Sequence, residues 1–146
     1  MDLATTVKLR IYDWIAQTTV VPAAQQLATD CGLSLEAARD AMDQLESLRL
    51  LVLDKATREI RMAPPFSAVP TQHRAVVRNQ SYTANCVWDA FGVVAALGGT
   101  GIVETASGGS GTPLRIPVTD SRPAPVPCVF HYAVPAARWW QDIVFT

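Results

Sequence analysis

The chain has 146 residues, of which 49% are hydrophobic and 17% are charged. This balance is typical of a globular protein with a buried core and excludes a disordered chain. A net charge of −1 argues against binding to polyanions, and charges at positions 8, 10 and 13 argue against a signal peptide or a membrane span in the first segment. We therefore expect a cytoplasmic protein with no membrane partner.

Residues 1–63 carry the pattern of three helices and a hairpin. Apolar residues at helical spacing predict a helix over residues 3–15, Pro22 opens a second helix that Gly32 closes, and Ser34 caps a third helix that reaches residue 49. Strands are expected at residues 50–53 and 59–62. This order outlines a winged-helix-like domain. The residues expected to face its core are Leu3, Val7, Ile11, Trp14, Ile15, Leu35, Ala38, Met42, Leu45 and Leu48.

A winged helix raises the alternative that the chain is a transcriptional regulator with a ligand-sensing C-terminal domain. The third helix, which would enter DNA, is rich in acidic residues, and residues 1–63 hold nine Asp and Glu against seven Lys and Arg. Phosphate contacts require the opposite balance. We therefore predict that this domain does not bind nucleic acid and instead covers the C-terminal part of the chain.

Residues 64–70 are rich in proline and are expected to form an extended linker between two domains. A small domain is expected over residues 71–146. Its predicted elements are strands at 71–77, 101–105, 114–118 and 128–134, a helix after Thr83 that is buried on most sides and stops at Gly98, and a final helix at 136–143. The predicted fold class is α+β, with a winged-helix-like three-helix unit followed by a small mixed or antiparallel sheet packed with helices.

The candidate site is the pair Cys86 and Asp89 at the start of the helix after residue 83. Three residues apart on a helix, a thiol and a carboxylate share one face. The free N–H groups of the first turn favour a lowered thiol pKa, while the apolar neighbours Val87, Trp88 and Phe91 favour a raised pKa for Asp89. The pair thus suits a thiolate that binds a soft metal and an acid that delivers a proton. A buried structural cysteine beside a solvated aspartate stays open on spacing alone.

Several ordered segments resemble the alkylmercury lyase (organomercurial lyase) family. They are Pro-Pro-Phe-Ser at 64–67, Asn-Cys-Val-Trp-Asp-Ala-Phe-Gly at 85–92, Ala-Leu-Gly at 96–98, Gly-Thr-Pro at 111–113 and Arg-Trp-Trp-Gln-Asp-Ile-Val-Phe-Thr at 138–146. The resemblance implies cleavage of carbon–mercury bonds, in which Cys86 captures mercury and Asp89 delivers the proton that releases carbon. We expect Phe66, Trp88 and Tyr82 to line the substrate pocket. No cofactor is expected, since mercury enters with the substrate and stays in the product.

The chain departs from the family pattern in two places. Ser107 stands where many members have a cysteine. The resemblance also implies a second mercury-binding thiol directly after residue 146, and either a truncated product or a selenocysteine codon would explain its absence from the given sequence. Cys128 is the candidate second thiol within the chain. With Cys86 alone, we expect capture of an organomercurial with slow or absent release of the hydrocarbon.

The expected partners are a small organomercurial and either small thiols or a protein that accepts mercury. Three widely separated cysteines, Cys31, Cys86 and Cys128, argue against a disulfide framework and against a zinc site of the Cys-x-x-Cys type. A third class is a Cys–His hydrolase built on Cys86 and His131, which requires the imidazole within hydrogen-bond reach of the sulfur. His73 is expected on a strand surface, without a role.

Overall fold

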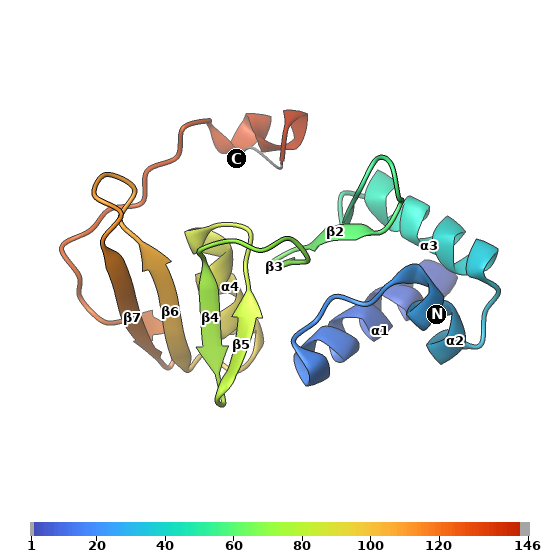
Figure 1. The fold of residues 1–146 in the computed structure, drawn as a ribbon, viewed down its shortest axis with the longest axis horizontal. Coiled ribbons are helices and arrows are strands. Elements are labelled where there is room, and N and C mark those ends of the chain that lie inside the picture. The colour runs from blue at the N-terminus through green and yellow to red at the C-terminus, as the bar shows by residue number, and fades with distance from the viewer. Residues whose placement is uncertain (1, 144–146) are drawn as a thin grey trace.

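The computed structural model describes residues 2–143 of the chain (Figure 1). Three helices come first, α1 (Leu3–Thr18), α2 (Ala24–Cys31) and α3 (Leu35–Ser47). As predicted, the Ser34 hydroxyl accepts a hydrogen bond from a free amide of α3, and Gly32 ends α2 with a left-handed φ of 65° that suits a residue without Cβ. No helix within residues 2–143 is both long and apolar enough to cross a membrane.

The three helices bury one face each in a shared core. Val7, Ile11 and Ile15 of α1 pack there with Leu27, Met42 and Leu45, and all six side chains are at most 1% exposed. The prediction is wrong for Leu3 and Leu48, which are 43% and 59% exposed. Leu3 is the first residue of α1 and Leu48 follows the last residue of α3, so both lie at helix ends, where neighbouring helices no longer cover the side chain.

A three-stranded antiparallel sheet follows the helices. Its strands are β1 (Val52–Leu53), β2 (Ile60–Ala63) and β3 (Phe66–Ser67), in that order. β1 and β2 form the predicted hairpin. β3 lies within the segment predicted as a linker, which is therefore partly a strand. Phe66 also forms a bridge with Ala84, so this segment connects the two sheets directly.

The second sheet has five strands, all antiparallel to their neighbours, in the order β5-β4-β6-β7-β8. The predicted hairpin of β6 and β7 is present. The strands are β4 (Arg74–Val77), β5 (Gln80–Thr83), β6 (Gly101–Ala106), β7 (Pro113–Thr119) and β8 (Arg122–Pro123).

Two of these strands were not predicted. β5 begins after a two-residue turn in which Arg78 and Asn79 both take positive φ, and only Asn79 belongs to the residue types that commonly signal such a turn. β8 contains Pro123, which cannot donate a backbone hydrogen bond. It is tolerated because β8 is an edge strand with a neighbour on one side only.

Helix α4 (Val87–Ala96) packs on the second sheet through contacts with β4 and β6. Its buried residues are Ala90, Val93 and Val94. Gly101 permits close packing at the start of β6, since a Cβ there would lie 2.6 Å from the Val76 carbonyl oxygen. The helix ends before Gly98, as predicted. It is not buried on most sides, because it covers one sheet face and leaves residues such as Trp88 exposed.

Aromatic contacts join the helical part to the second sheet. The Phe66 ring lies between Tyr12 and Tyr82, with ring centroids 6.2 and 5.9 Å away. The Tyr82 hydroxyl donates to the Ala16 carbonyl at 2.9 Å, and the Tyr12 hydroxyl donates to the Pro64 carbonyl at 2.8 Å. The helices and the sheet thus share one hydrophobic core.

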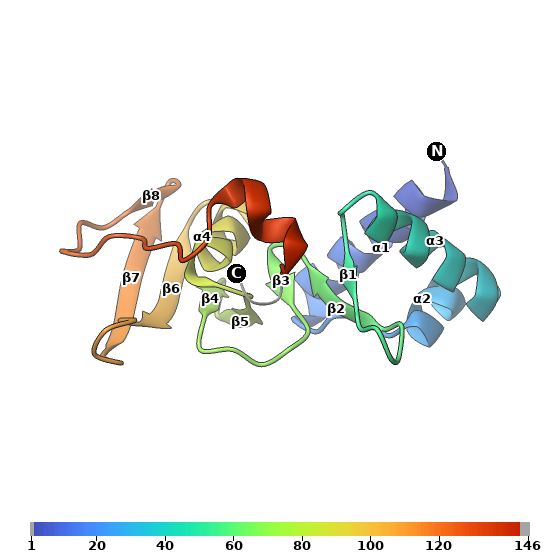
Figure 2. The same cartoon turned by 90° about the horizontal axis from the view of Figure 1, so that it is seen from above.

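Residues 124–143 contain one short element, the 3₁₀ helix η1 (Ala136–Gln141), where a longer helix was predicted. The prediction of a half-buried strand at 128–134 is wrong, since these residues pair with no strand and Val129 is 92% exposed. Their alternating pattern had no free sheet edge beside it. η1 lies over α4 and the small sheet (Figures 1 and 2). The last part of the motif, residues 144–146, falls outside the described residues.

Candidate active site

Cys86 is the N-cap of α4. Its backbone is extended (φ −139°, ψ 176°), and its sulfur accepts a hydrogen bond of 3.5 Å from the Asp89 amide, as a serine would at this position. The thiol in turn donates to Asp89 Oδ2 at 3.4 Å. The expectation of a first-turn cysteine is wrong by one position, because the helix begins at Val87. The two side chains nevertheless face each other directly.

Burial governs the acidity of both groups. Desolvation raises the pKa of the Asp89 carboxyl, as expected from its apolar neighbours. Desolvation also raises the pKa of the Cys86 thiol, and the nearby Asp89 charge adds to this, outweighing the helix amides that lower it. The predicted lowered pKa is therefore wrong for the resting thiol. The proton stays on the sulfur, in a hydrogen bond that points at the carboxylate.

Cys86 and Asp89 line one wall of a cavity of about 200 Å³. Trp88 lines it too, as predicted. The other lining residues are Met62, Pro64, Asn85, Tyr132, Trp139, Trp140 and Ile143. The cavity is therefore built by three parts of the chain: the end of β2, the start of α4 and the segment around η1.

A second cavity, also of about 200 Å³, opens on the other side of the Cys86 sulfur. Cys86, Trp88, Tyr132 and Trp139 line both cavities, whereas Asp89 lines only the first. The residues particular to the second are Val87, Phe130, His131, Ala133 and Val134. The thiol can thus be reached from two compartments, of which one contains the acid.

Rings from residues 130–140 form the outer wall of both cavities. Trp88 meets Phe130 and Tyr132 edge to face, with centroids 5.8 and 6.4 Å apart, and Tyr132 packs on Trp139 at 5.3 Å. The Arg49 guanidinium lies 5.8 Å from the centre of the Trp140 ring. This aromatic wall, defined as Trp88, Tyr132, Trp139 and Trp140, was not predicted around the site. The density of aromatic residues after position 129 was the signal in the sequence.

Two residues assigned to the pocket from the sequence lie elsewhere. Phe66 and Tyr82 are 3% and 2% exposed and belong to the core between α1 and the second sheet. Neither lines the cavities at Cys86. We correct the predicted pocket at these two positions: Phe66 is held in β3 and cannot close over the site, and its role is to support the strand that leads to Cys86.

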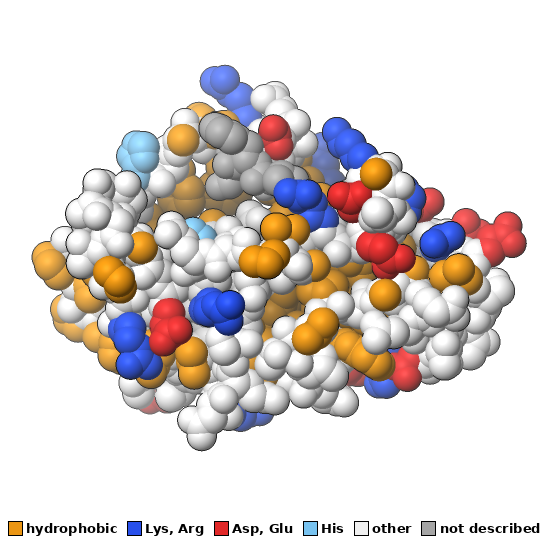
Figure 3. All heavy atoms as spheres, in the orientation of Figure 1, with side chains coloured by type: hydrophobic (Ala, Val, Ile, Leu, Met, Phe, Trp, Pro, Cys, Tyr) orange, Lys and Arg blue, Asp and Glu red, His pale blue; other side chains and the backbone are white. Residues whose placement is uncertain are grey.

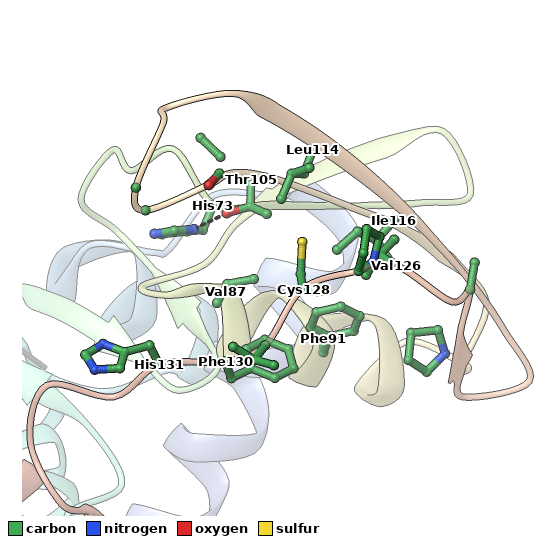
Figure 4. A pocket seen from close by; sticks show the side chains of 18 of the residues that line it. His73, Val87, Phe91, Thr105, Leu114, Ile116, Val126, Cys128, Phe130 and His131 are labelled. Carbon is green, nitrogen blue, oxygen red and sulfur yellow. Dashed lines mark hydrogen bonds between the residues drawn. The ribbon is translucent and has the colours of Figure 1, made fainter.

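Cys128 lines a different and larger cavity of about 870 Å³, between β6, β7 and the segment after β8 (Figure 4). It is absent from the lining of both cavities at Cys86. His73 lies in the larger cavity as well, where its Nδ1 and the Thr105 hydroxyl are 2.8 Å apart and burial lowers the pKa of its imidazole. The structure therefore does not bring Cys128 to Cys86 as a second thiol.

Within residues 2–143, no three His, Cys, Asp or Glu side chains converge as ligands for a resident metal ion. Cys31 is half-buried at the end of α2, and its thiol is free. The chemistry available at the candidate site is thus that of one thiol and one carboxyl group in an aromatic enclosure.

The family model for alkylmercury lyase (MerB) matches residues 66–146, which is more than half of the chain. The chain belongs to the alkylmercury lyase family. The matched region begins at β3 and includes α4 with Cys86 and Asp89, the second sheet and the aromatic wall except its Arg49 neighbour. The resemblance noted from the sequence motifs is confirmed at the level of the family.

A solved structure described as the mercury-bound form of MerB2 has a similar fold. Its TM-score is 0.65 at 15% sequence identity, and the alignment covers 86% of this chain and 60% of that one. The chain thus spans less than two thirds of the length of that structure. No curated protein sequence matches the chain. At this identity the similarity establishes the α+β fold, including part of the helical unit that precedes the family match.

Proposed function

We propose that the chain is an alkylmercury lyase-like enzyme in which the Cys86 thiolate binds the mercury of R–Hg–X and Asp89 protonates the departing carbon. The observation that carries this proposal is the 3.4 Å hydrogen bond from Cys86 Sγ to Asp89 Oδ2 in the wall of a cavity. A thiolate is a soft ligand for a soft cation such as mercury. A carboxyl group with a raised pKa is suited to general acid catalysis.

The hydrogen bond gives the thiol proton a destination. In the first step a bond forms between Cys86 Sγ and mercury, X⁻ leaves, and the proton passes to Asp89. In the second step Asp89 returns this proton to the carbon, and the electron pair of the carbon–mercury bond forms the new C–H bond. The products are R–H and mercury(II) on the sulfur. A small thiol then supplies the second mercury ligand and loses its proton to water.

The direction of both pKa shifts supports this order. A raised pKa keeps the proton on Cys86 until mercury replaces it. The raised pKa of Asp89 lets the carboxyl group hold the transferred proton until the carbon accepts it. The same desolvated surroundings that oppose a free thiolate therefore favour a coupled exchange of mercury for the proton.

The other two functions receive less support. The Cys86 thiol donates to Asp89, and His131 lines the second cavity without serving as the hydrogen-bond partner that a Cys–His hydrolase needs. For the regulator, cations of the helical part are engaged in ion pairs, with Arg10 on Asp30 and Arg58 on Asp43 and Glu46. Neither arrangement offers a reason to prefer these alternatives.

The test uses a full chain in which Cys31→Ser and Cys128→Ser leave Cys86 as the only thiol. We expect one phenylmercury group per chain by intact mass, and benzene release when a small thiol is added. The same chain with Cys86→Ser should bind none and release no benzene above the protein-free rate. Benzene release from the chain without thiols, or no adduct on the chain that retains Cys86, would overturn the proposal.

A further inference from the structure

We infer that the aromatic wall makes this site selective for aryl over methyl organomercurials, with the aryl ring held in the cavity that contains Asp89. This inference rests on the proposed function at Cys86. It concerns Trp88, Tyr132, Trp139 and Trp140, and it assigns separate tasks to the two cavities.

The position of Asp89 decides which cavity takes the organic group. The carbon attached to mercury must face the acid that protonates it. Because Asp89 lines only the first cavity, R has to lie there while mercury is on Cys86. The second cavity, reached from the other side of the sulfur, is then left for X or for the small thiol that becomes the second mercury ligand.

The size of the first cavity matches an aromatic ring. Its volume is about 200 Å³, and a cavity of about 150 Å³ is enough to bind benzene. A methyl group would leave most of this space without contacts, so the surrounding side chains would gain little from it. The polar groups at its wall include the Asn85 amide and the Asp89 carboxyl, and neither offers a positive charge to an anionic organic group.

The rings of the wall are held in place by contacts outside the cavity. Trp88 is anchored on α4 and packs edge to face on Phe130. The Trp139 indole N–H donates to the Val134 carbonyl at 2.8 Å, and the Trp140 ring lies beside the Arg49 guanidinium. Rings fixed in this way can pack on a bound aryl group with little further loss of freedom.

The experiment measures competition at the single thiol of the chain with Cys31→Ser and Cys128→Ser. Equal amounts of phenylmercury and methylmercury compete for a limiting amount of protein, and intact mass gives the ratio of the two adducts. Dividing by the ratio found on free cysteine removes the intrinsic preference of a thiol. We expect the corrected ratio to favour phenyl by about tenfold or more, since each aromatic contact contributes roughly twofold to tenfold.

Three further variants locate the effect. Trp140→Leu, which changes the Asp89-side cavity alone, should lower the corrected ratio about twofold to tenfold. Trp14→Leu, on α1 outside both cavities, is the matched control and should leave the ratio unchanged. Val134→Phe fills part of the second cavity and should also leave it unchanged, because the organic group does not lie there.

The outcomes separate this inference from the function on which it rests. An adduct at Cys86 with the ratio of free cysteine would overturn the aryl selectivity and leave the proposed function standing. A ratio lowered by Val134→Phe and unaffected by Trp140→Leu would place the organic group in the wrong cavity and overturn the assignment. If Cys86 forms no adduct with either compound, both the proposed function and this inference are wrong.

Discussion

The two sides of the candidate site are built in opposite ways. The floor is α4 with the second sheet, where Val93, Val94 and Val103 are fully buried. The roof is the segment 124–143, where Val129 is 92% exposed and the structure describes only one short 3₁₀ helix. The floor carries Cys86 and Asp89, and the roof carries Tyr132, Trp139 and Trp140.

The difference separates chemistry from recognition. Cys86 and Asp89 must keep a fixed mutual geometry for mercury and proton to exchange, and a capped helix on a packed sheet supplies it. The rings of the roof need only enclose the organic group. Because the roof contributes little to the shared core, we expect it to be adjustable at low cost in stability, while changes in the floor should affect both folding and chemistry.

The largest expected effect lies in the floor and concerns catalysis. Asp89→Asn retains the shape of the side chain and removes the acid, so phenylmercury should still bind Cys86 while benzene release slows by about 10²- to 10⁴-fold. The measurement is single-turnover benzene release from a preformed adduct in the presence of a small thiol. An Asn variant that releases benzene as fast as the parent chain would remove Asp89 from the chemistry.

A matched pair of valines compares the stability of floor and roof. Val94→Ala removes two buried methyl groups next to the sheet and should lower the free energy of unfolding by about 1.5–3 kcal/mol. Val129→Ala makes the same change at an exposed position and should stay within about 0.5 kcal/mol of the parent. Urea unfolding of both variants gives the comparison. Equal losses would show that the roof is packed as firmly as the floor.

The acidity of Cys86 gives a smaller effect with a definite sign. Its raised pKa means that the folded chain holds the thiol proton more tightly than the unfolded chain does. The resulting stabilisation is fully present below the unfolded value of about 8.5 and is lost as pH rises through the folded value. Alkylation of the single-thiol chain by iodoacetamide should therefore have its midpoint above pH 8.5.

The Asp89→Asn variant separates the two causes of that shift. Removing the carboxylate charge should move the alkylation midpoint to lower pH, while burial keeps it above that of a free thiol. A midpoint below about 8.5 in the parent chain would show that the helix amides dominate, as the sequence alone suggested.

The smallest expected effect concerns the helical unit, which supports the floor through α1. Acidic and basic side chains are interspersed over its surface in the view of Figure 3, with no basic stripe for a phosphate backbone. At about 150 mM salt we expect no duplex DNA binding tighter than the non-specific range of roughly 10⁻⁴–10⁻⁶ M. Sequence-dependent binding below one micromolar in a fluorescence titration would revive the regulator function.

The floor could be predicted from the sequence far better than the roof. Local signals determine it: Ser34 and Gly32 mark helix ends, alternating residues mark β6 and β7, and the spacing of Cys86 and Asp89 places both on one side of α4. These interactions involve residues close together in the chain, so their pattern is visible without a structure.

The roof and the pocket wall depend on contacts between distant residues. Residues 128–134 alternate as a strand does, yet no sheet edge is available to pair with them. Phe66 looked like a lid because it follows two prolines, whereas its pairing in β3 and its contacts with Tyr12 and Tyr82 make it core. The raised pKa of Cys86 likewise depends on burial by the roof, which helix position alone does not reveal.

The most direct test of the account is a crystal structure of the Asp89→Asn chain treated with phenylmercury, since this variant should retain the adduct. We predict mercury on Cys86 Sγ, the phenyl carbon facing residue 89, and the ring enclosed by Trp88 and Trp140 beneath η1. Mercury bound at Cys128 in the larger cavity, or a phenyl ring turned toward His131 and away from residue 89, would contradict the view that floor and roof form one active site.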